Sequence, residues 1–286
     1  EVDPVRYATA TIDSLVPGNH FEGYAPLSAI FAPLTSLNAD GSVTPFAAES
    51  IESDDATTWT ITLQEGWTFH NGDPVTAQNY VDTWNHNAYG PNAFVNGPQL
   101  AAIAGYSDVA PAEGEPSTTE MSGLKVVDDR TFTVTLSAPD RQFPLQLSLL
   151  QTGFYPMPTG ALDDVDAYNK NPIGNGPFEV VGEWDPDQPL ETVAYDAYAG
   201  PEPTIDALPF VPYLDTNVAY TDALAGEVDI VGIFGAQAEQ GRNDFGDRYF
   251  EADAPGVDLI GVNLKDPRFT DPRIRQALSM AIDRDA

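Results

Sequence analysis

The stretch Trp59–Asn79, WTITLQEGWTFHNGDPVTAQN, decides the fold of the chain around it. In its first residues the apolar side chains of Trp59, Ile61 and Leu63 alternate with threonines. This period of two predicts a strand in a sheet that has one buried and one solvent-facing side. The residues Asn71-Gly72-Asp73-Pro74 then predict a turn. A strand followed closely by a turn indicates a hairpin-rich unit.

A helix is predicted directly after this turn. Thr76 is the expected N-cap, and apolar residues recur behind it at helical spacing: Ala77, Tyr80, Val81, Trp84 and Ala88. We expect this apolar stripe to cover the sheet. Further strands are predicted at Leu124–Val127 and, after a turn at Asp128-Asp129, at the alternating residues Phe132, Val134 and Leu136.

The segments on either side of this unit have a different pattern of predicted strands and helices. Upstream, Val5–Ile12 alternates like a half-buried strand, and the apolar segment Ala25–Leu34 predicts a helix. Downstream, Gly176–Val181 and Leu190–Tyr195 predict a strand pair, followed by a helix near Val218–Leu224 that ends at Gly226.

The last part of the chain predicts strands followed by helices. The apolar run Val228–Phe234 is typical of a strand that is covered on both faces in a parallel sheet. Asp258–Leu264 predicts another strand, and Asp271–Asp283 a helix with Asp271 as cap and Pro272 at its first position. The outer segments therefore predict an α/β platform with an inserted hairpin-rich subdomain.

Composition limits the function. The chain has 286 residues, enough for two compact units, and a formal charge of -32 from 44 acidic and 12 basic residues. Nucleic acid is excluded as a partner, because neutralising phosphates requires clustered Lys and Arg. We interpret the acidic residues as a solvated surface that keeps the protein soluble and monomeric. A calcium loop is disfavoured, because Asp163–Asp166 lacks the alternating carboxylates and the turn glycine of an EF-hand.

Signatures of catalysis are absent from the sequence. It contains no cysteine, no nucleophile elbow, no phosphate-binding loop and no His-Glu-x-x-His helix. The three histidines, His20, His70 and His86, lie far apart, and His70 beside Asn71-Gly72 is interpreted as a turn residue in preference to a metal ligand. We therefore expect no enzymatic activity, no cofactor and no metal site.

Five motifs in order resemble the bacterial extracellular solute-binding proteins of family 5, which serve oligopeptide, dipeptide and nickel importers. The stretch Trp59–Asn79 resembles the signature of this family most closely. The other four are Pro45–Ser50 (PFAAES), Ile173–Phe178 (IGNGPF), Gly226–Asp229 (GEVD) and Phe269–Arg284 (FTDPRIRQALSMAIDR). Most of these residues have structural roles in turns and core, so they identify the fold and not the ligand.

The resemblance implies an α/β fold of the type II periplasmic-binding-protein kind, in which a ligand is enclosed between two lobes. Residues 1–42 and 158–264 would form lobe I, residues 43–157 the inserted subdomain, and residues 265–286 the start of lobe II. Most of lobe II is then expected to be absent. The chain begins at Glu1 with neither Met nor a signal peptide, from which we expect a processed or trimmed protein.

The resemblance also implies a function. The protein would be the substrate-binding component of an ABC importer, would capture oligopeptides and would deliver them to membrane permease subunits. It would be extracytoplasmic, in the periplasm or tethered to the outer face of the cell membrane by a lipidated cysteine upstream of Glu1, since no segment here is apolar enough to span a membrane.

Candidate ligand-binding residues come from the same resemblance. Glu22, Gly23 and Tyr24 follow Ser14–Pro17 as Glu-Gly follows Ser-Leu-Asp-Pro in relatives, so they would face the cleft and offer backbone hydrogen bonds. An ordinary surface loop is the alternative interpretation. By approximate alignment alone, a side-chain pocket in the inserted subdomain would be lined by Phe94, Gln151 and Phe154.

Other functions stay open at this point. A family member could instead bind an oligosaccharide, a nickel chelate or haem, although the few histidines disfavour nickel. At Gly261 some peptide-binding relatives carry an acidic residue, and this departure puts the transfer of ligand preference in doubt. A hydrolase, or a structural surface protein, is the alternative from a different class.

Overall fold

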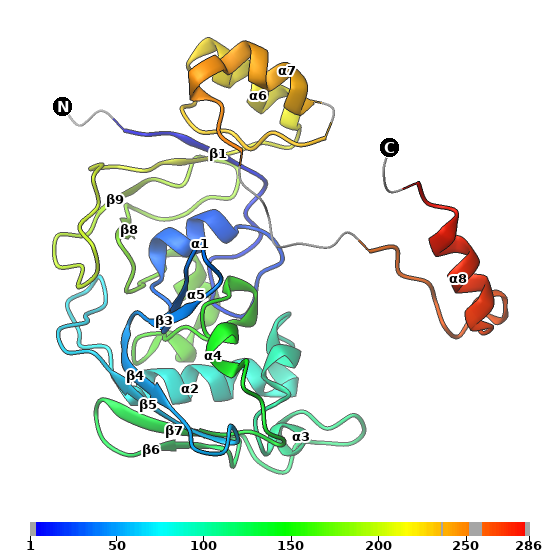
Figure 1. Cartoon of the computed structure of the whole chain (residues 1–286). Coiled ribbons are helices and arrows are strands. Elements are labelled where there is room, and N and C mark those ends of the chain that lie inside the picture. The colour runs from blue at the N-terminus through cyan, green and yellow to red at the C-terminus, as the bar shows by residue number, and fades with distance from the viewer. Residues whose placement is uncertain (1–3, 236, 252–258, 284–286) are drawn as a thin grey trace. The chain divides into compact units, whose positions relative to one another are not determined.

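The strand predicted at the beginning of Trp59–Asn79 is β5 (Thr58–Leu63), an inner strand of a four-stranded antiparallel sheet (Figure 1). The computed structural model describes residues 4–235, 237–251 and 259–283. In the sheet β5 pairs with β4 (Ala48–Glu52) and β7 (Thr131–Thr135), and β7 also pairs with β6 (Leu124–Val126). The alternation along β5 is confirmed, since Trp59, Ile61 and Leu63 are all buried.

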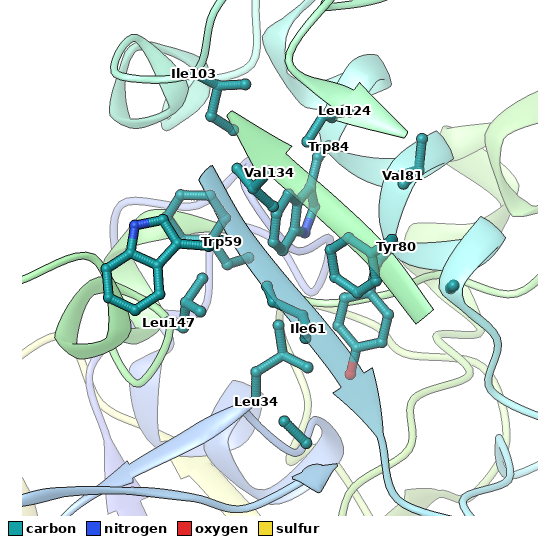
Figure 2. Close-up of a cluster of buried hydrophobic side chains, with 14 of the residues drawn as sticks. Leu34, Trp59, Ile61, Tyr80, Val81, Trp84, Ile103, Leu124, Val134 and Leu147 are labelled. Atoms are coloured by element: carbon teal, nitrogen blue, oxygen red, sulfur yellow. The ribbon is translucent and has the colours of Figure 1, made fainter. Parts of the chain in front are cut away.

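Helix α2 (Ala77–Ala88) begins where the sequence places it. The Thr76 hydroxyl accepts a hydrogen bond from the Asn79 N–H, and the Asn79 side-chain oxygen accepts one from the Thr76 N–H at 2.9 Å, which completes a capping box. Tyr80 and Trp84 on its buried face pack against Phe132 of β7, with ring centroids 5.6 and 5.5 Å apart. Figure 2 shows the Tyr80 and Trp84 rings beside Ile61 and Val134 of the sheet.

The buried side chains form two hydrophobic clusters. The first is drawn from residues 32–154 and contains the sheet and α2. The second is drawn from residues 12–31 and 155–210, with Phe94 added from the middle of the chain. Ile173 packs against both. The limits proposed for lobe I and its inserted subdomain stay a prediction.

A parallel strand pair connects the two ends of the second cluster. Strand β1 (Tyr7–Thr9) pairs in parallel with β10 (Phe210–Pro212), and Tyr7 forms a parallel bridge to Ile230. The strand pair predicted downstream is confirmed as β8 (Phe178–Val180) and β9 (Thr192–Ala194). The segments that carry β1, β8, β9 and α6 (Thr216–Ala225) lie together in the upper part of Figure 1.

Two predicted strands are wrong. Val228–Phe234 forms no strand beyond the bridge at Ile230, and it is largely exposed, with Phe234 75% exposed. Gly232 has no side chain to bury, and Gly235 adopts a left-handed conformation with φ +58°, so the run leaves β1 instead of following it. Leu259–Leu264 likewise forms no strand, whereas Asp258 lies outside the described residues.

The remaining elements include shorter helices and strands. The first strand, β1, and the first helix, α1 (Tyr24–Ile30), are shorter than predicted. Gly23 and Phe31 are the caps of α1, and Phe31 has extended backbone that ends the helix. The others are β2 (Thr35–Leu37), β3 (Val43–Pro45), α3 (Tyr106–Val109), α4 (Phe143–Gln146), α5 (Val165–Lys170) and α7 (Gln237–Phe245). Single 3-10 turns occur at Gly90–Asn92, Gly97–Leu100, Leu150–Thr152, Ala161–Asp163, Gly246–Arg248 and Pro267–Phe269.

The chain divides into two units, residues 1–240 and 241–286. The second contains α8 (Pro272–Met280), in which Pro272 is the first residue and the Asp271 carboxylate accepts from the Arg273 N–H at 2.9 Å. The predicted cap is therefore confirmed. The apolar stripe of α8 is half exposed, with Ile274 at 46% and Leu278 at 47%.

Candidate ligand-binding site

A hollow of about 380 Å³ lies at the C-terminal end of β1, within the first unit. It brings together four segments that are distant in sequence, and three of its residues are the predicted Glu22, Gly23 and Tyr24. The other lining residues are Tyr7–Thr11, Ala25, Tyr213, Leu214, Thr216, Ala219, Val231, Gly232 and Phe234.

The rim at Glu22–Tyr24 is built by Asp13. Its carboxylate accepts a hydrogen bond from the Phe21 N–H at 2.7 Å and another from the Glu22 N–H at 3.0 Å. Gly23 then adopts φ +79° at the start of α1, a left-handed conformation that strongly favours glycine, and a Cβ there would lie 3.3 Å from Ile12 Cγ2. The Asp13 carboxylate thus fixes the backbone of the rim through the amides of Phe21 and Glu22.

The segment that follows β1 lines the hollow with unpaired backbone. The Ile230 N–H donates to the Arg6 carbonyl at 3.1 Å, and the Ala8 N–H donates to the Ile230 carbonyl at 2.8 Å. Beyond this point the two segments separate. Within the described ranges, the backbone groups of Ala10 and Thr11 form no hydrogen bond to the protein, so they remain available to a partner.

Two tyrosines report a negative electrostatic environment on both sides of the hollow. Partial burial raises the pKa of Tyr24, and the nearby carboxylates of Glu22 and Asp13 raise it further. Burial also raises the pKa of Tyr213 to about 12, helped by the carboxylate of Asp222, which accepts the Tyr213 hydroxyl at 2.8 Å. Both phenols are therefore neutral hydrogen-bonding groups near neutral pH.

The other three predicted site residues do not lie at this hollow. Phe154 is 1% exposed in the first cluster, with its ring centroid 4.7 Å from that of Trp84. Phe94 is 9% exposed and packs edge-on against His86 at 5.1 Å. Gln151 is exposed in a 3-10 turn. A ligand-binding role for these three stays a prediction, although Phe154 is closed off in this conformation.

Sequence reasoning missed most of the hollow. Tyr213, Leu214 and Phe234 stand on segments about 200 residues away from β1 in sequence, and no local pattern links them to it. One signal was present, however. Phe234 is a large apolar residue directly before Gly235, at the end of the predicted strand. This position indicates a side chain that leaves the strand and is exposed at its end.

Metal and membrane sites receive no support from the residues that the structure covers. Within these ranges, no three His, Asp or Glu side chains gather closely enough to hold a metal ion. His70 instead binds backbone, because its ring nitrogens contact Gly174 N at 3.2 Å and Gly176 O at 3.1 Å. No helix among the described residues has the length and apolar character needed to cross a bilayer.

The first unit thus combines a four-stranded antiparallel sheet with a parallel strand pair, and a hollow lies at the end of that pair. The chain belongs to the bacterial extracellular solute-binding proteins, family 5, whose sequence model matches residues 42–286. This confirms the resemblance read from the motifs, and members of this family are binding proteins.

Curated relatives share about a quarter of their residues with the chain. It is 27% identical over 260 residues to the periplasmic murein peptide-binding protein MppA of Escherichia coli, covering 89% of this chain and 48% of MppA. It is 28% identical over 274 residues to the dipeptide-binding protein DppE of Bacillus subtilis, covering 92% and 48%. The chain therefore spans about half the length of the curated relatives it matches.

Solved structures confirm the fold. OppA of Burkholderia pseudomallei superposes with a TM-score of 0.80 at 24% identity, over 99% of this chain and 56% of that one. The Escherichia coli murein tripeptide binding protein MppA gives a TM-score of 0.79 at 24% identity, over 99% and 56%. The predicted type II periplasmic-binding-protein architecture, present in part, is thereby confirmed.

Proposed function

We propose that the full-length protein is the substrate-binding component of an ABC importer, and that it captures oligopeptides and passes them unchanged to permease subunits. The unpaired backbone of Ala10 and Thr11 at the hollow carries this proposal. Every peptide has N–H and C=O groups along its length, so pairing with a strand edge binds peptides whatever their side chains are. A sugar has no such regular ladder of donors and acceptors.

The rim supplies a second set of backbone groups. The Glu22 backbone N–H already donates to the Asp13 carboxylate. Of the backbone groups of Glu22, only the carbonyl is therefore left to bind a peptide. Among the described residues, no hydrogen bond uses that carbonyl or the Gly23 N–H. A peptide lying between the rim and the β1 edge would meet both sets, with Tyr24, 37% exposed, beside its side chains.

The names of the relatives support peptides as the ligand, since MppA, DppE and OppA are described as murein peptide-, dipeptide- and oligopeptide-binding proteins. Those proteins are about twice as long as this chain. We place the second wall of the cleft, and the acid that would bind the peptide amino terminus, in a second lobe of the full-length protein. The protein would act outside the cytoplasm as a monomer, with a lipid anchor as its attachment to the membrane.

Native mass spectrometry of the full-length protein, purified without refolding, tests the proposal. We expect a ladder of retained peptide masses. A retained oligosaccharide, nickel chelate or haem would contradict peptide capture, and turnover of a retained peptide into hydrolysis products would contradict binding without chemistry.

The chain of residues 1–286 provides a second test. With one wall of the cleft absent, isothermal titration with mixed peptides should show no tight binding, because half of the contacts and the enclosure are missing. Submicromolar affinity of this chain would show that the hollow alone suffices, and would contradict a cleft shared between two lobes.

A further inference from the structure

The charge among the residues that line the hollow is negative only. Glu22 is the one charged residue among those that line it, and it is exposed, with no ion pair of its carboxylate among the described residues. No Lys, Arg or His lines the hollow. The cation closest in sequence to β1, Arg6, is bound to Asp229 at 3.0 Å and to the Gly226 carbonyl at 2.9 Å.

Further carboxylates stand behind the lining. Asp13 lies under the rim, where its two oxygens hold the Phe21 and Glu22 amides, and Asp222 lies behind Tyr213. Burial is the main cause of the raised pKa values of Tyr24 and Tyr213, and carboxylates near each tyrosine raise them further. At Tyr213 the Arg6 guanidinium partly opposes this effect. An acidic side chain or a peptide carboxylate placed beside Glu22 would meet repulsion, because no cation is among the lining residues.

The walls are apolar and aromatic where they are exposed. Leu214 is 95%, Phe234 is 75% and Tyr24 is 37% exposed. The Tyr24 ring also packs edge to face with the buried ring of His20, with centroids 5.6 Å apart. Long cationic side chains suit such walls, since the methylene stem of Lys or Arg covers apolar surface while the head reaches a carboxylate. An aromatic face also attracts a cation directly, Arg more often than Lys.

We infer that this hollow selects peptides with an arginine or lysine side chain, whose stem packs on Tyr24 and Phe234 and whose charged head pairs with Glu22. This inference rests on the proposed function and names its substrate class: cationic peptides are preferred, neutral peptides are accepted through their backbone, and acidic residues are rejected at this position.

The preference for cationic peptides should be small, because the Glu22 carboxylate is exposed to solvent. Ion pairs of solvent-accessible side chains stabilise weakly, so we expect an arginine peptide to bind about threefold more tightly than its neutral counterpart. A glutamate peptide should bind several-fold more weakly than the neutral one. Raising the salt concentration should reduce both differences, because the Debye length falls from about 8 Å at 0.15 M to about 3 Å at 1 M.

The experiment uses the full-length protein, stripped of bound peptide, and equimolar pools of alanine-based tri-, tetra- and pentapeptides. One residue, at each position in turn, is arginine, citrulline, glutamate or alanine. Citrulline has nearly the shape of arginine without its charge. The bound peptides are then released and separated by chromatography before mass spectrometry, because an arginine peptide and its citrulline counterpart have nearly the same mass and positional isomers have identical mass.

Two variants separate the site from the general charge of the protein. In Glu22→Gln the advantage of arginine over citrulline should disappear, while alanine peptides remain bound. In Glu113→Gln, which removes an equal charge from the exposed loop after α3, the advantage should be unchanged. Both substitutions are at exposed positions, and equal melting temperatures would show that both variants are folded.

The outcomes distinguish the two proposals. Equal occupancy by arginine, citrulline and glutamate peptides, or an arginine advantage that persists in Glu22→Gln, would overturn the selection by charge and leave peptide capture intact. If no peptide were retained, not even the alanine series, peptide capture would fail and the inference would fail with it.

Discussion

His70 and Gly174 hydrogen-bond to each other in both directions. The Gly174 backbone N–H donates to His70 Nδ1 at 3.2 Å, and the backbone N–H of His70 donates to the Gly174 carbonyl at 2.9 Å. With Nδ1 accepting, the ring proton is on Nε2, which donates to the Gly176 carbonyl at 3.1 Å. The turn after β5 and the loop before β8 are therefore joined by one neutral imidazole.

This arrangement predicts a pH-dependent stability. Burial lowers the pKa of His70 from 6.5 to about 4, because the charged ring would be desolvated, and the hydrogen bond to the Gly176 carbonyl offsets this only in part. The unfolded chain binds this proton below pH 6.5 and the folded chain only below about pH 4, so the contribution is complete above pH 6.5 and is lost as the pH falls to 4. It amounts to up to about 3 kcal/mol at 1.36 kcal/mol per pKa unit.

Urea unfolding of the wild type and His70→Asn between pH 4 and 7.5 measures this contribution. The difference in unfolding free energy between them should shrink as the pH falls, since the carboxylates titrate alike in both. A difference that is constant across this range would show that His70 titrates normally in the folded protein.

Gly174→Ala should destabilise the protein strongly. A Cβ at this position would lie 2.0 Å from the Ile30 carbonyl oxygen, a backbone atom that cannot move without shifting α1. We expect a loss of about 3 kcal/mol or more, at the upper end of overpacking costs. Gly261→Ala, where a Cβ meets no atom within 4 Å, is the control and should be neutral. Thermal unfolding of both variants checks this, and equal melting temperatures would contradict the close approach.

Thr76→Ala should cost about 1 kcal/mol, because it removes the hydroxyl that caps α2. Thr76→Ser keeps the hydroxyl and should recover most of the loss. Chemical denaturation measures both, and an equal loss in the two variants would show that the methyl group, and not the cap, is what stabilises the helix.

Asp13→Ala should weaken the binding of all peptides to the full-length protein, and the advantage of arginine over citrulline should fall only slightly, because Asp13 is a more distant part of the negative charge than Glu22. Loss of its two amide contacts releases the rim at Glu22, whereas the Glu22 carboxylate that we assign to selection is retained. Titration with the arginine and citrulline peptides measures both affinities. If instead the arginine peptide alone were affected, Asp13 would be part of the charge selection.

Phe154→Ala should act on stability and not on ligand preference. The side chain is 1% exposed between Trp84 and Phe143, and removing a buried aromatic ring costs about 3–5 kcal/mol. Phe154→Leu keeps most of the volume and should leave enough folded protein to titrate with peptides. A change in peptide preference in that variant would place Phe154 at the ligand, as the sequence alignment suggested.

Local signals predicted the elements that are determined locally. The alternation in β5, the cap at Thr76 and the Asp271-Pro272 start of α8 each depend on residues within a few positions of one another, so the sequence displays them directly. The buried run expected at Val228–Phe234 failed because an apolar run reports affinity for a core, and it does not report whether neighbouring strands are present to cover both faces.

Contacts between distant segments could not be predicted. His70 was correctly placed in a turn, but its partner Gly174 is 104 positions away and no pattern marks it. Phe154 illustrates the same limit, since an aromatic residue suits a core and a pocket equally well. Glu22, Gly23 and Tyr24 line the hollow, and their role in ligand binding stays a prediction. The hydrogen bonds from Asp13 that hold this segment depend on geometry that only the structure supplies.

The bridge between β1 and Ile230 has a consequence for the nascent chain. Arg6 and Asp229 bind each other across 223 positions, so β1 is synthesised long before the segment around Asp229 that it contacts. At about 5–20 residues per second this delay is roughly 10 to 45 seconds. During that time β1 lacks both of its partners, β10 and the segment at Ile230, so more of its backbone is unpaired than in the folded protein. A chaperone that binds nascent chains would find exposed backbone there.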